Sequence, residues 1–351
     1  MTTKNENKTM HIAVCLDDTY FAPAFLLVNS IIETNKDEKL YFHVIFSSLR
    51  DEYVRQFKTL ASDSVYVAFH QISEESLKHC PIRPQDHVSL ATYFRILLPV
   101  ILPDDVRKVL YVDSDMLCLD RITNMYEEDL TGFSMAASFD CQCENPARKA
   151  HLGLDTDSKY FAAGVLLVNL EYWRANKVHI RTLDYIAENT DLCVWHDQDA
   201  LNAVLKGTIK RLDFKYNFYE LYFKVKSKST LSDNLWAEAL RDRRNICLLH
   251  YSQAEKPWHY ECEHPLRNLW RAYHKKILGR EGKKLRLKFK YRGRRRLSYI
   301  KRKILRTVFH FTINENYEIH EGDAMLDSYF EKLGVPRNLL LRPIRCHKKE
   351  N

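Results

Sequence analysis

Glycine is scarce in this chain, in which only 9 of the 351 residues are glycine. The pattern Gly-x-Gly-x-x-Gly does not occur, and neither does the phosphate-loop pattern that ends in Gly-Lys-Ser or Gly-Lys-Thr. Dinucleotide oxidoreductases and P-loop nucleotide triphosphatases use these glycines to bring the backbone close to phosphate groups. The chain therefore lacks the sequence signatures of both enzyme classes.

Long apolar runs are also absent. No uninterrupted apolar stretch approaches the roughly 20 residues that a membrane-spanning helix needs, and residues 1–10 are polar, with no signal-peptide core. The nine cysteines include no Cys-x-x-Cys pair, so their spacing does not predict a zinc knuckle. We expect reduced thiols in a cytoplasmic protein, with Cys15, Cys118 and Cys247 packed in the core.

Acidic residues are nearly missing from one stretch near the end. Between Lys275 and Arg306 there are 16 lysines and arginines and one acidic residue, Glu281. Apolar and basic residues alternate over 283–291, and over 297–311 the apolar residues fall on one helical face opposite a basic face. This pattern is typical of a helix on an anionic membrane surface. Nucleic-acid binding and a solvated helix that packs on the main domain remain alternatives.

The chain is expected to have three parts: a catalytic domain over 1–275, a basic membrane-docking segment over 276–312, and an extension of unknown role over 313–351. In the first part, short apolar strands alternate with helix-like segments. This alternation predicts an α/β fold with a mixed, mostly parallel sheet flanked by helices. The expected strands are 11–16, 41–46, 65–69, 109–112, 133–138, 164–169 and 246–250, and the expected helices are 22–34, 51–60, 89–98, 199–205 and, in the last part, 324–333.

Two carboxylates follow the apolar strand 109–112 directly. Asp113 and Asp115 flank a single small residue, Ser114. Ligand sites in open α/β sheets lie at the ends of strands, and carboxylates placed there are costly unless a positive group joins them. A divalent cation with a preference for oxygen ligands is the natural candidate. The alternative interpretation is a solvated turn.

Further polar groups follow other expected elements. Asp17 could accept a hydrogen bond from a base or a ribose, and Tyr20 could stack on a ring. Taken alone, this segment is more typical of an ordinary strand-to-helix turn in which Asp or Thr caps the helix. Arg95 interrupts an apolar helix, where a guanidinium usually has a carboxylate or phosphate partner. The alternative is a surface arginine whose aliphatic stem lies along the apolar surface while its guanidinium stays in water.

Two later segments complete the set. Asp197, Gln198 and Asp199 precede an apolar helix, and helix capping explains only one of them. His250 ends the strand 246–250 and could complete a metal site, although a lone histidine is more often structural. Lys256 precedes a proline that restricts it to extended conformations, which suits a contact with a diphosphate on the same metal.

Together these segments resemble the retaining glycosyltransferases of family 8, which include bacterial lipopolysaccharide galactosyl- and glucosyltransferases and glycogenin. The resemblance covers about residues 10–275, and it depends on the joint order and spacing of short motifs that are weak one by one. The motifs are Asp17-Asp18, Thr92-Tyr93-Phe94-Arg95, Leu110-Tyr-Val-Asp-Ser-Asp115, Ala163-Gly-Val-Leu-Leu-Val-Asn169, Asp197-Gln-Asp199 and His250-x5-Lys-Pro-Trp258.

The resemblance implies a Rossmann-like GT-A fold, a UDP-sugar donor and a role for each motif residue. The metal, Mn²⁺ or alternatively Mg²⁺, would be held by Asp113, Asp115 and His250. The nucleotide would contact Cys15, Asp17, Thr19, Tyr20, Ser114 and Lys256. The transferred sugar would be surrounded by Arg95, Asp113, Asp140, Asp197 and Gln198, and Asp197 and Gln198 would serve catalysis.

These residue types suit the chemistry of sugar transfer. Cleavage of the bond to UDP places negative charge on the diphosphate, which a metal and a lysine stabilise, and the sugar becomes oxocarbenium-like. No carboxylate is an obvious nucleophile, and Gln198 is a poor one, although its carbonyl could steady a positive anomeric carbon. We therefore favour front-face return, in which the acceptor attacks the side that UDP leaves and the departing phosphate oxygen takes the proton.

The chain departs from the family pattern at two positions. Ala162 stands where the family usually has asparagine, which removes a hydrogen-bonding group expected at the donor sugar. Gln253 stands where the family often has glycine, near the diphosphate. Because the metal and nucleotide residues are intact, we expect binding to persist and the identity of the donor sugar to be the property most affected.

The resulting prediction is a metal-dependent retaining hexosyltransferase that moves galactose or glucose from a UDP-sugar to a cell-surface glycan such as lipopolysaccharide core. It would be cytoplasmic and would bind the inner membrane face through residues 283–311. A metal-dependent nucleotidyltransferase is the alternative enzyme class, because it also uses paired aspartates at strand ends. A nucleic-acid-binding protein that uses the basic tract is the alternative outside enzymes, and it would bind with a steep salt dependence.

Overall fold

The computed structural model describes residues 9–83, 89–224, 230–279, 285–309 and 327–336. The chain divides into two compact units, residues 1–252 and residues 253–351. The predicted division at residues 275 and 312 stays a prediction. No helix in the described ranges is both long and apolar enough to cross a membrane.

A seven-stranded sheet forms the centre of the first unit, in the order β3-β2-β1-β4-β7-β6-β8. Four neighbouring strands run parallel, while β7 runs antiparallel to both β4 and β6, so the sheet is mixed and mostly parallel, as predicted. The strands are β1 (Met10–Cys15), β2 (Leu40–Phe46), β3 (Val65–Gln71), β4 (Lys108–Val112), β6 (Met135–Ser138), β7 (Val165–Asn169) and β8 (Ile209–Leu212).

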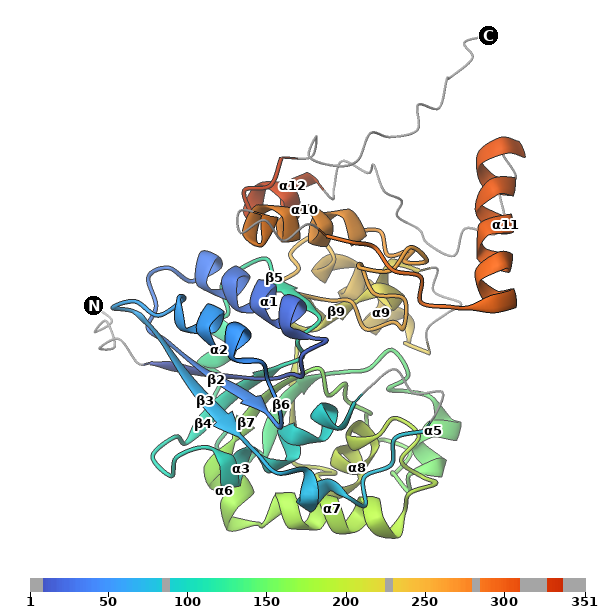
Figure 1. Cartoon of the computed structure of the whole chain (residues 1–351). Coiled ribbons are helices and arrows are strands. Elements are labelled where there is room, and N and C mark those ends of the chain that lie inside the picture. Colours follow the sequence, from blue (N-terminus) through green and yellow to red (C-terminus); the bar gives the residue numbers. More distant parts are fainter. Residues whose placement is uncertain (1–8, 84–88, 225–229, 280–284, 310–326, 337–351) are drawn as a thin grey trace. The chain divides into compact units, whose positions relative to one another are not determined.

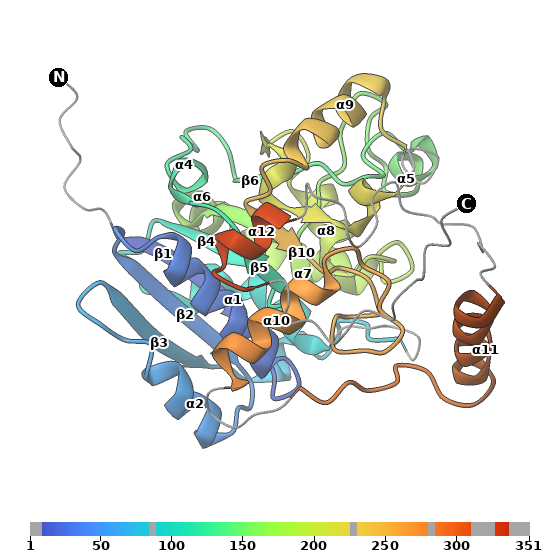
Figure 2. The same ribbon diagram turned by 90° about the horizontal axis from the view of Figure 1, so that it is seen from above.

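Helices cover both faces of this sheet (Figure 1). On one face lie α1 (Phe21–Thr34) and α2 (Asp51–Lys58), where Phe21 and Phe25 pack edge-on against Phe57. Figure 2 shows β3, β2 and β1 side by side beneath α1. The helices on the other face are α3 (Leu98–Ile101), α6 (Leu170–Ala175), α7 (Val178–Glu188) and α8 (Asp197–Val204).

The main apolar core lies between the sheet and this second set of helices. It includes Ala13 and Tyr111 from the sheet and Trp173 and Leu201 from the helices, and each of these side chains is nearly or fully buried. The cysteines expected in the core, Cys15, Cys118 and Cys247, are buried free thiols. The strands that carry polar residues at their ends are therefore fixed from both faces.

The expected helix over 89–98 exists, but most of it is the 3₁₀ helix η2 (Leu90–Leu97), which continues into α3. Arg95 Nε donates a hydrogen bond to the backbone oxygen of Thr92 at 2.9 Å, so the side chain takes up a carbonyl of the same turn. A tight 3₁₀ turn of this kind is common in short connecting segments. The pattern of apolar residues predicted the helix but not its type.

A second, three-stranded sheet was not predicted as a sheet. Its strands are β5 (Met116–Cys118), β9 (Phe218–Tyr219) and β10 (Leu248–His250), in the order β5-β10-β9. The strand β10 runs antiparallel to β5, and His250 pairs with Met116. This pairing places the end of β10 beside the segment that joins β4 to β5.

The remaining helices of the first unit are short connections. They are η1 (Glu74–Leu77), α4 (Thr123–Tyr126), α5 (Pro146–His151), η3 (Phe214–Tyr216), η4 (Glu220–Phe223) and α9 (Asp233–Asp242).

The second unit contains three helices in its described residues: α10 (Arg267–Ile277), α11 (Gly293–Phe309) and α12 (Asp327–Lys332). The helix expected over 297–311 is α11 where the structure describes it, and residues 310–311 of that prediction lie outside the described residues. The helix expected over 324–333 is α12 where the structure describes it, and residues 324–326 of that prediction lie outside the described residues.

Candidate active site

The segment Asp113-Ser114-Asp115 connects the two sheets of the first unit. Strand β4 ends at Val112 and β5 begins at Met116. The backbone N–H of Asp113 donates to Gly164 O at 2.9 Å, and Ser114 Oγ donates to Cys15 O at 2.7 Å. These bonds to β7 and β1 neighbours hold the two carboxylates in place, so the segment is not the solvated turn of the alternative interpretation.

His250 lies beside both carboxylates. Its Nε2 is 3.2 Å from Asp115 Oδ1 and 3.8 Å from Asp113 Oδ2. The three residues each offer one ligand atom within 4.8 Å of the other two. The residues predicted to hold a metal are thus brought together from two different sheets.

Asn217 sets the orientation of this histidine, and no sequence pattern had indicated this residue. Asn217 Oδ1 lies 2.9 Å from His250 Nδ1. Because a side-chain amide oxygen can only accept, Nδ1 donates this hydrogen bond, and Nε2 is the nitrogen that faces the carboxylates. Metal-binding histidines typically have such a partner on the second nitrogen.

Gly164 provides the space that His250 occupies. A Cβ at this position would lie 2.7 Å from His250 Cε1 and 2.9 Å from Nδ1. Real Cβ atoms do not approach so closely, so any side chain here must displace the imidazole. The glycine of the Ala163-Gly-Val motif is therefore required by the histidine that ends β10.

Arg95 lies between two predicted site residues. Its guanidinium is 2.9 Å from Asp113 Oδ1 and 3.0 Å from Asp197 Oδ2, and its side chain is only 5% exposed. Burial disfavours the charge, but the two carboxylates outweigh this effect and raise the pKa of Arg95. The prediction that Arg95 has a carboxylate partner is confirmed, and the surface alternative is wrong.

The first turn of α8 is built from the three consecutive polar groups. Burial raises the pKa of Asp197 to about 6 even though the Arg95 guanidinium lowers it, and the Asp113 carboxylate adds to the rise. Gln198 Oε1 accepts the backbone N–H of Ala163 at 2.8 Å. Each of these side chains therefore has a partner outside α8, as the excess over simple capping suggested.

A buried network that the sequence did not reveal holds the other end of Gln198. Gln198 Nε2 donates to Tyr160 Oη at 3.1 Å, and Tyr160 Oη donates to Asp199 Oδ1 at 2.5 Å. Arg148 pairs with the same carboxylate at 2.7 Å. These contacts fix the amide of Gln198 at both ends.

A small pocket of about 90 Å³ lies against the carboxylates. Its walls include Cys15, Asp17, Tyr20 and Ser114, four of the six residues predicted to bind the nucleotide. Asp17 Oδ1 also accepts the hydroxyl of Thr19 at 2.6 Å, so Asp17 both shapes the turn and lines the pocket.

Asp140 is linked to the candidate active site indirectly, through Tyr219. Burial raises the pKa of Asp140, and Tyr219 Oη donates to its Oδ2 at 3.1 Å. The ring of Tyr219 lies 6.3 Å from the ring of His250 between centroids.

Ala162, at the position where the family usually has asparagine, is buried, and its N–H donates to Ser138 O at 2.9 Å.

Lys256 belongs to the second unit, where its backbone N–H donates to His259 Nδ1 at 3.0 Å. Its contact with a diphosphate stays a prediction.

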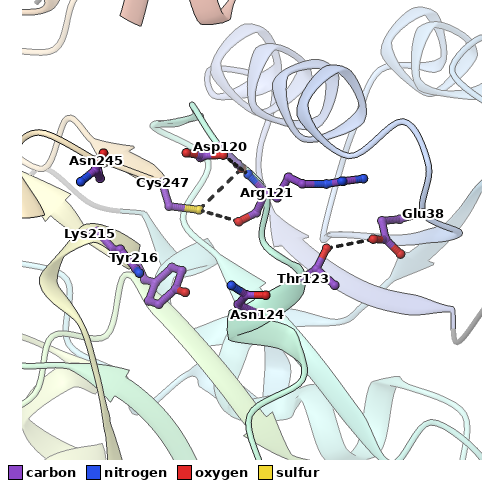
Figure 3. Close-up of a pocket in the computed structure, with 9 residues that line it drawn as sticks. All are labelled: Glu38, Asp120, Arg121, Thr123, Asn124, Lys215, Tyr216, Asn245 and Cys247. Atoms are coloured by element: carbon purple, nitrogen blue, oxygen red, sulfur yellow. Dashed lines mark hydrogen bonds between the residues drawn. The ribbon is translucent and has the colours of Figure 1, made fainter. Parts of the chain in front are cut away.

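A larger pocket, of about 440 Å³, lies at the other end of β5 and β10 (Figure 3). Its charged side chains are already paired: Arg121 is 2.7 Å from Asp37, and Thr123 Oγ1 donates to Glu38 at 3.0 Å. None of the predicted site residues lines it. The smaller pocket, where carboxylates, an imidazole and a guanidinium converge, is therefore the candidate active site.

The sequence profile described as Glycosyl transferase family 8 matches residues 11–262. General stress protein A of Bacillus subtilis is 27% identical over 276 residues, which cover 76% of this chain and 94% of that protein. Lipopolysaccharide 1,2-glucosyltransferase of Escherichia coli is 24% identical over 261 residues, which cover 73% of this chain and 75% of that protein.

Among solved structures, the galactosyltransferase LgtC in complex with donor and acceptor sugar analogues is similar to this chain. The match has a TM-score of 0.68 and 27% sequence identity, and it covers 76% of this chain and 96% of that one. The fold that the strand and helix pattern predicted is therefore found in an enzyme that transfers a sugar.

Proposed function

The chain belongs to glycosyl transferase family 8, and from this premise we propose that it is a Mn²⁺-dependent enzyme that transfers galactose or glucose from a UDP-hexose with retention of anomeric configuration. The observation that carries the proposal is the convergence of Asp113, Asp115 and His250 next to the Arg95–Asp197 pair and Gln198. The acceptor is a cell-surface glycan or glycolipid, such as lipopolysaccharide core.

The three convergent residues suit a divalent cation. Two carboxylates and a neutral imidazole form a mixed oxygen and nitrogen ligand set, which Mn²⁺ accepts and Mg²⁺ accepts less readily. The hydrogen bond from His250 Nδ1 to Asn217 leaves Nε2 available as a ligand. When bound, the cation would stabilise the negative charge that develops on the departing diphosphate.

The nucleotide would occupy the pocket lined by Cys15, Asp17, Tyr20 and Ser114. Asp17 Oδ1 is used by the turn, so its second oxygen is the one that would accept from a base or ribose. Tyr20 presents an aromatic ring on the same wall and would stack on the uracil. Lys256 would add a positive charge at the phosphates.

The chain's own residues then position the sugar. Arg95 is held between Asp113 and Asp197, so the donor-sugar residues form one rigid unit. The amide of Gln198 is fixed by Ala163 and Tyr160, so its carbonyl oxygen can steady the positive charge at the anomeric carbon without reorganisation. The acceptor hydroxyl would attack the face that the diphosphate leaves, and the departing phosphate oxygen would take its proton.

The acceptor and the location are inferred from the basic tract and from the relatives. Several similar proteins are named as lipopolysaccharide glucosyl- or galactosyltransferases. The helix α11 exposes Leu297 (65% exposed) among arginines. These features support a cytoplasmic enzyme that is peripheral on the inner face of the membrane and docks through residues 283–311.

The proposal is tested by incubating the protein with a panel of UDP-sugars and Mn²⁺ and measuring the UDP that is released. We expect release from UDP-galactose or UDP-glucose and none after the metal is chelated. The variant Asp104→Asn is the control: it changes a fully exposed carboxylate and should leave the rate of UDP release unchanged. No release from any UDP-sugar in the presence of Mn²⁺ would contradict the proposal.

The preferred nucleotide distinguishes a glycosyltransferase from the alternative enzyme class, a nucleotidyltransferase. A nucleotidyltransferase should be stabilised against heat by CTP or another nucleoside triphosphate with Mn²⁺. We expect UDP with Mn²⁺ to raise the melting temperature more than CTP does. The nucleic-acid-binding alternative predicts salt-sensitive binding to duplex DNA or RNA, and we expect none through the catalytic unit.

A further inference from the structure

Three histidines form a hydrogen-bonded row across the edge strand of the large sheet and the two strands next to it, away from the candidate active site. His11 lies on β1, His43 on β2 and His70 on β3. The strand register pairs Ala13 with His43 and Ile45 with His70, so the three side chains share one face of the sheet in a diagonal line.

The ring nitrogens of neighbouring histidines face one another. His11 Nδ1 lies 3.0 Å from His43 Nε2, and His43 Nδ1 lies 3.0 Å from His70 Nε2. His43 is buried, whereas His11 and His70 are partly exposed. The row is therefore reached from solvent at its ends.

We propose that His11 Nδ1 and His43 Nε2 form a second metal site, which binds a transition-metal ion such as Zn²⁺ or Ni²⁺. Zinc–nitrogen bonds of about 2.0–2.1 Å place two cis nitrogen ligands of one ion about 2.9–3.4 Å apart, and the observed separation falls in this range. Water would complete the coordination on the partly exposed side of His11.

His70 has a different part in this site. For His43 Nε2 to bind an ion as a neutral imidazole, the ring proton must be on Nδ1, and His70 Nε2 is placed to accept it. Such a second partner orients a ligating histidine and raises its basicity. His70 is thus a positioning residue, and His11 and His43 are the ligands.

Binding at this site requires a change of tautomer and a rotation of the two rings that turns both lone pairs from the hydrogen bond toward the ion. If the shared proton sits on His11 Nδ1 and is donated to His43, it moves to His11 Nε2, and the ion accepts one lone pair from each ring. No proton has to leave the protein.

The ligand type separates this site from the one at Asp113, Asp115 and His250. Two imidazoles favour Zn²⁺, Ni²⁺ or Cu²⁺, whereas carboxylate-rich sites favour Mn²⁺ and Mg²⁺. The proposal therefore does not depend on the glycosyltransferase chemistry, and either can fail without the other.

The test is a Zn²⁺ and Ni²⁺ titration of the full-length, tag-free protein after metal removal, by calorimetry and by Tm. The His250→Asn variant removes a ligand of the other site and should keep one binding event. In this background, His11→Asn should weaken that event at least tenfold, and His70→Asn should weaken it less. His179→Asn, a change of a histidine on α7, is the matched control and should bind like its parent.

His11 is chosen because it is partly exposed, so its variant is expected to fold even if a change at the buried His43 does not. Binding of Zn²⁺ should also raise Tm, since the ion joins β1 to β2, and this rise should disappear in His11→Asn. Equal stoichiometry and affinity with and without His11 would overturn the proposal, and so would the absence of any Zn²⁺ or Ni²⁺ binding in the His250→Asn protein.

Discussion

Two residues that are not proposed metal ligands decide whether His250 can bind an ion. Asn217 fixes the tautomer, and Gly164 leaves room for the ring. The sequence allowed Asp113, Asp115 and His250 to be predicted, because each follows or ends an apolar strand. It did not allow Asn217 to be predicted, because an amide 33 positions away from its partner leaves no local pattern.

The close approach at Gly164 gives a prediction for Gly164→Ala. The added methyl would meet His250 Cε1 at 2.7 Å, so the ring must move away from the carboxylates. We expect Mn²⁺ affinity and UDP release to fall at least tenfold, with a stability loss of about 1–3 kcal/mol from overpacking. Calorimetric Mn²⁺ titration and thermal unfolding measure the two effects.

Gly279→Ala is the control, because a Cβ there would make only an ordinary contact of 3.5 Å with Lys275. Wild-type Mn²⁺ affinity in Gly164→Ala would show that His250 is not a ligand.

The network behind Gln198 gives a second prediction, for Tyr160→Phe. Loss of the hydroxyl removes the acceptor for Gln198 Nε2 and a donor to Asp199. The carbonyl of Gln198 is then less well fixed, and we expect kcat to fall about tenfold while KM for the UDP-sugar changes little. Steady-state kinetics at saturating Mn²⁺ checks this.

Tyr66→Phe changes an exposed tyrosine and serves as the comparison. An unchanged kcat in Tyr160→Phe would remove Tyr160 from the catalytic arrangement. Asp199 was singled out by the sequence, but its partners Tyr160 and Arg148 escaped prediction because the pairing joins α5, α8 and the segment before β7, which are far apart in sequence.

At the scale of elements, strands and helices were predictable where the apolar period was clear, and the pairing of strands was not. The strands β1 to β4 and the helices α1 and α2 match the expected segments closely. The three-residue strand β5 is too short to show a period, and the antiparallel run of β7 depends on tertiary packing. The site forms where the segment between β4 and β5 lies beside the end of β10, so the sequence showed its motifs but not how they come together.

The histidine row on β1, β2 and β3 predicts how stability responds to pH. The pKa of His43 is lowered from 6.5 to about 3 in the folded chain, so the unfolded chain binds more protons between these values and stability falls as pH falls. For His43 alone the loss is about 2 kcal/mol between pH 7.5 and pH 5.

Chemical unfolding in buffer with a metal chelator measures this loss. In His43→Gln the stability should depend less on pH by about that amount. The same pH dependence in both proteins would contradict the assignment to His43.

At the scale of the whole molecule, charge is divided unevenly along the chain. The basic tract carries the positive charge, while the predicted catalytic residues lie mainly in the first unit. Catalysis and membrane docking should therefore be separable. The uneven distribution of charge was evident from composition alone. The acceptor cannot be specified from residue patterns, because its recognition depends on surface shape.

Deletion of residues 283–311 should release the protein from liposomes that contain anionic lipid and leave UDP-sugar hydrolysis largely intact. Each Lys or Arg near an anionic surface contributes about 1 kcal/mol, so loss of the tract removes most of the attraction. Liposome sedimentation and UDP release measure the two properties. A full-length companion variant replaces Arg294, Arg295, Arg296 and Lys301 with glutamine and should show weakened binding.

Unchanged liposome binding after the deletion would refute membrane docking through this tract. Loss of hydrolysis in both variants would instead show that the tract belongs to the catalytic machinery.

The most direct test of the central claim is UDP release from UDP-galactose and UDP-glucose as a function of Mn²⁺ concentration, compared between the natural protein and Asp115→Asn. Asp115 lies 3.2 Å from His250 Nε2, and its carboxylate is one of the three side chains proposed to hold the ion. We predict saturable Mn²⁺-dependent release in the natural protein and at least a hundredfold loss in the variant. Full activity of Asp115→Asn at the same Mn²⁺ concentration would contradict the account.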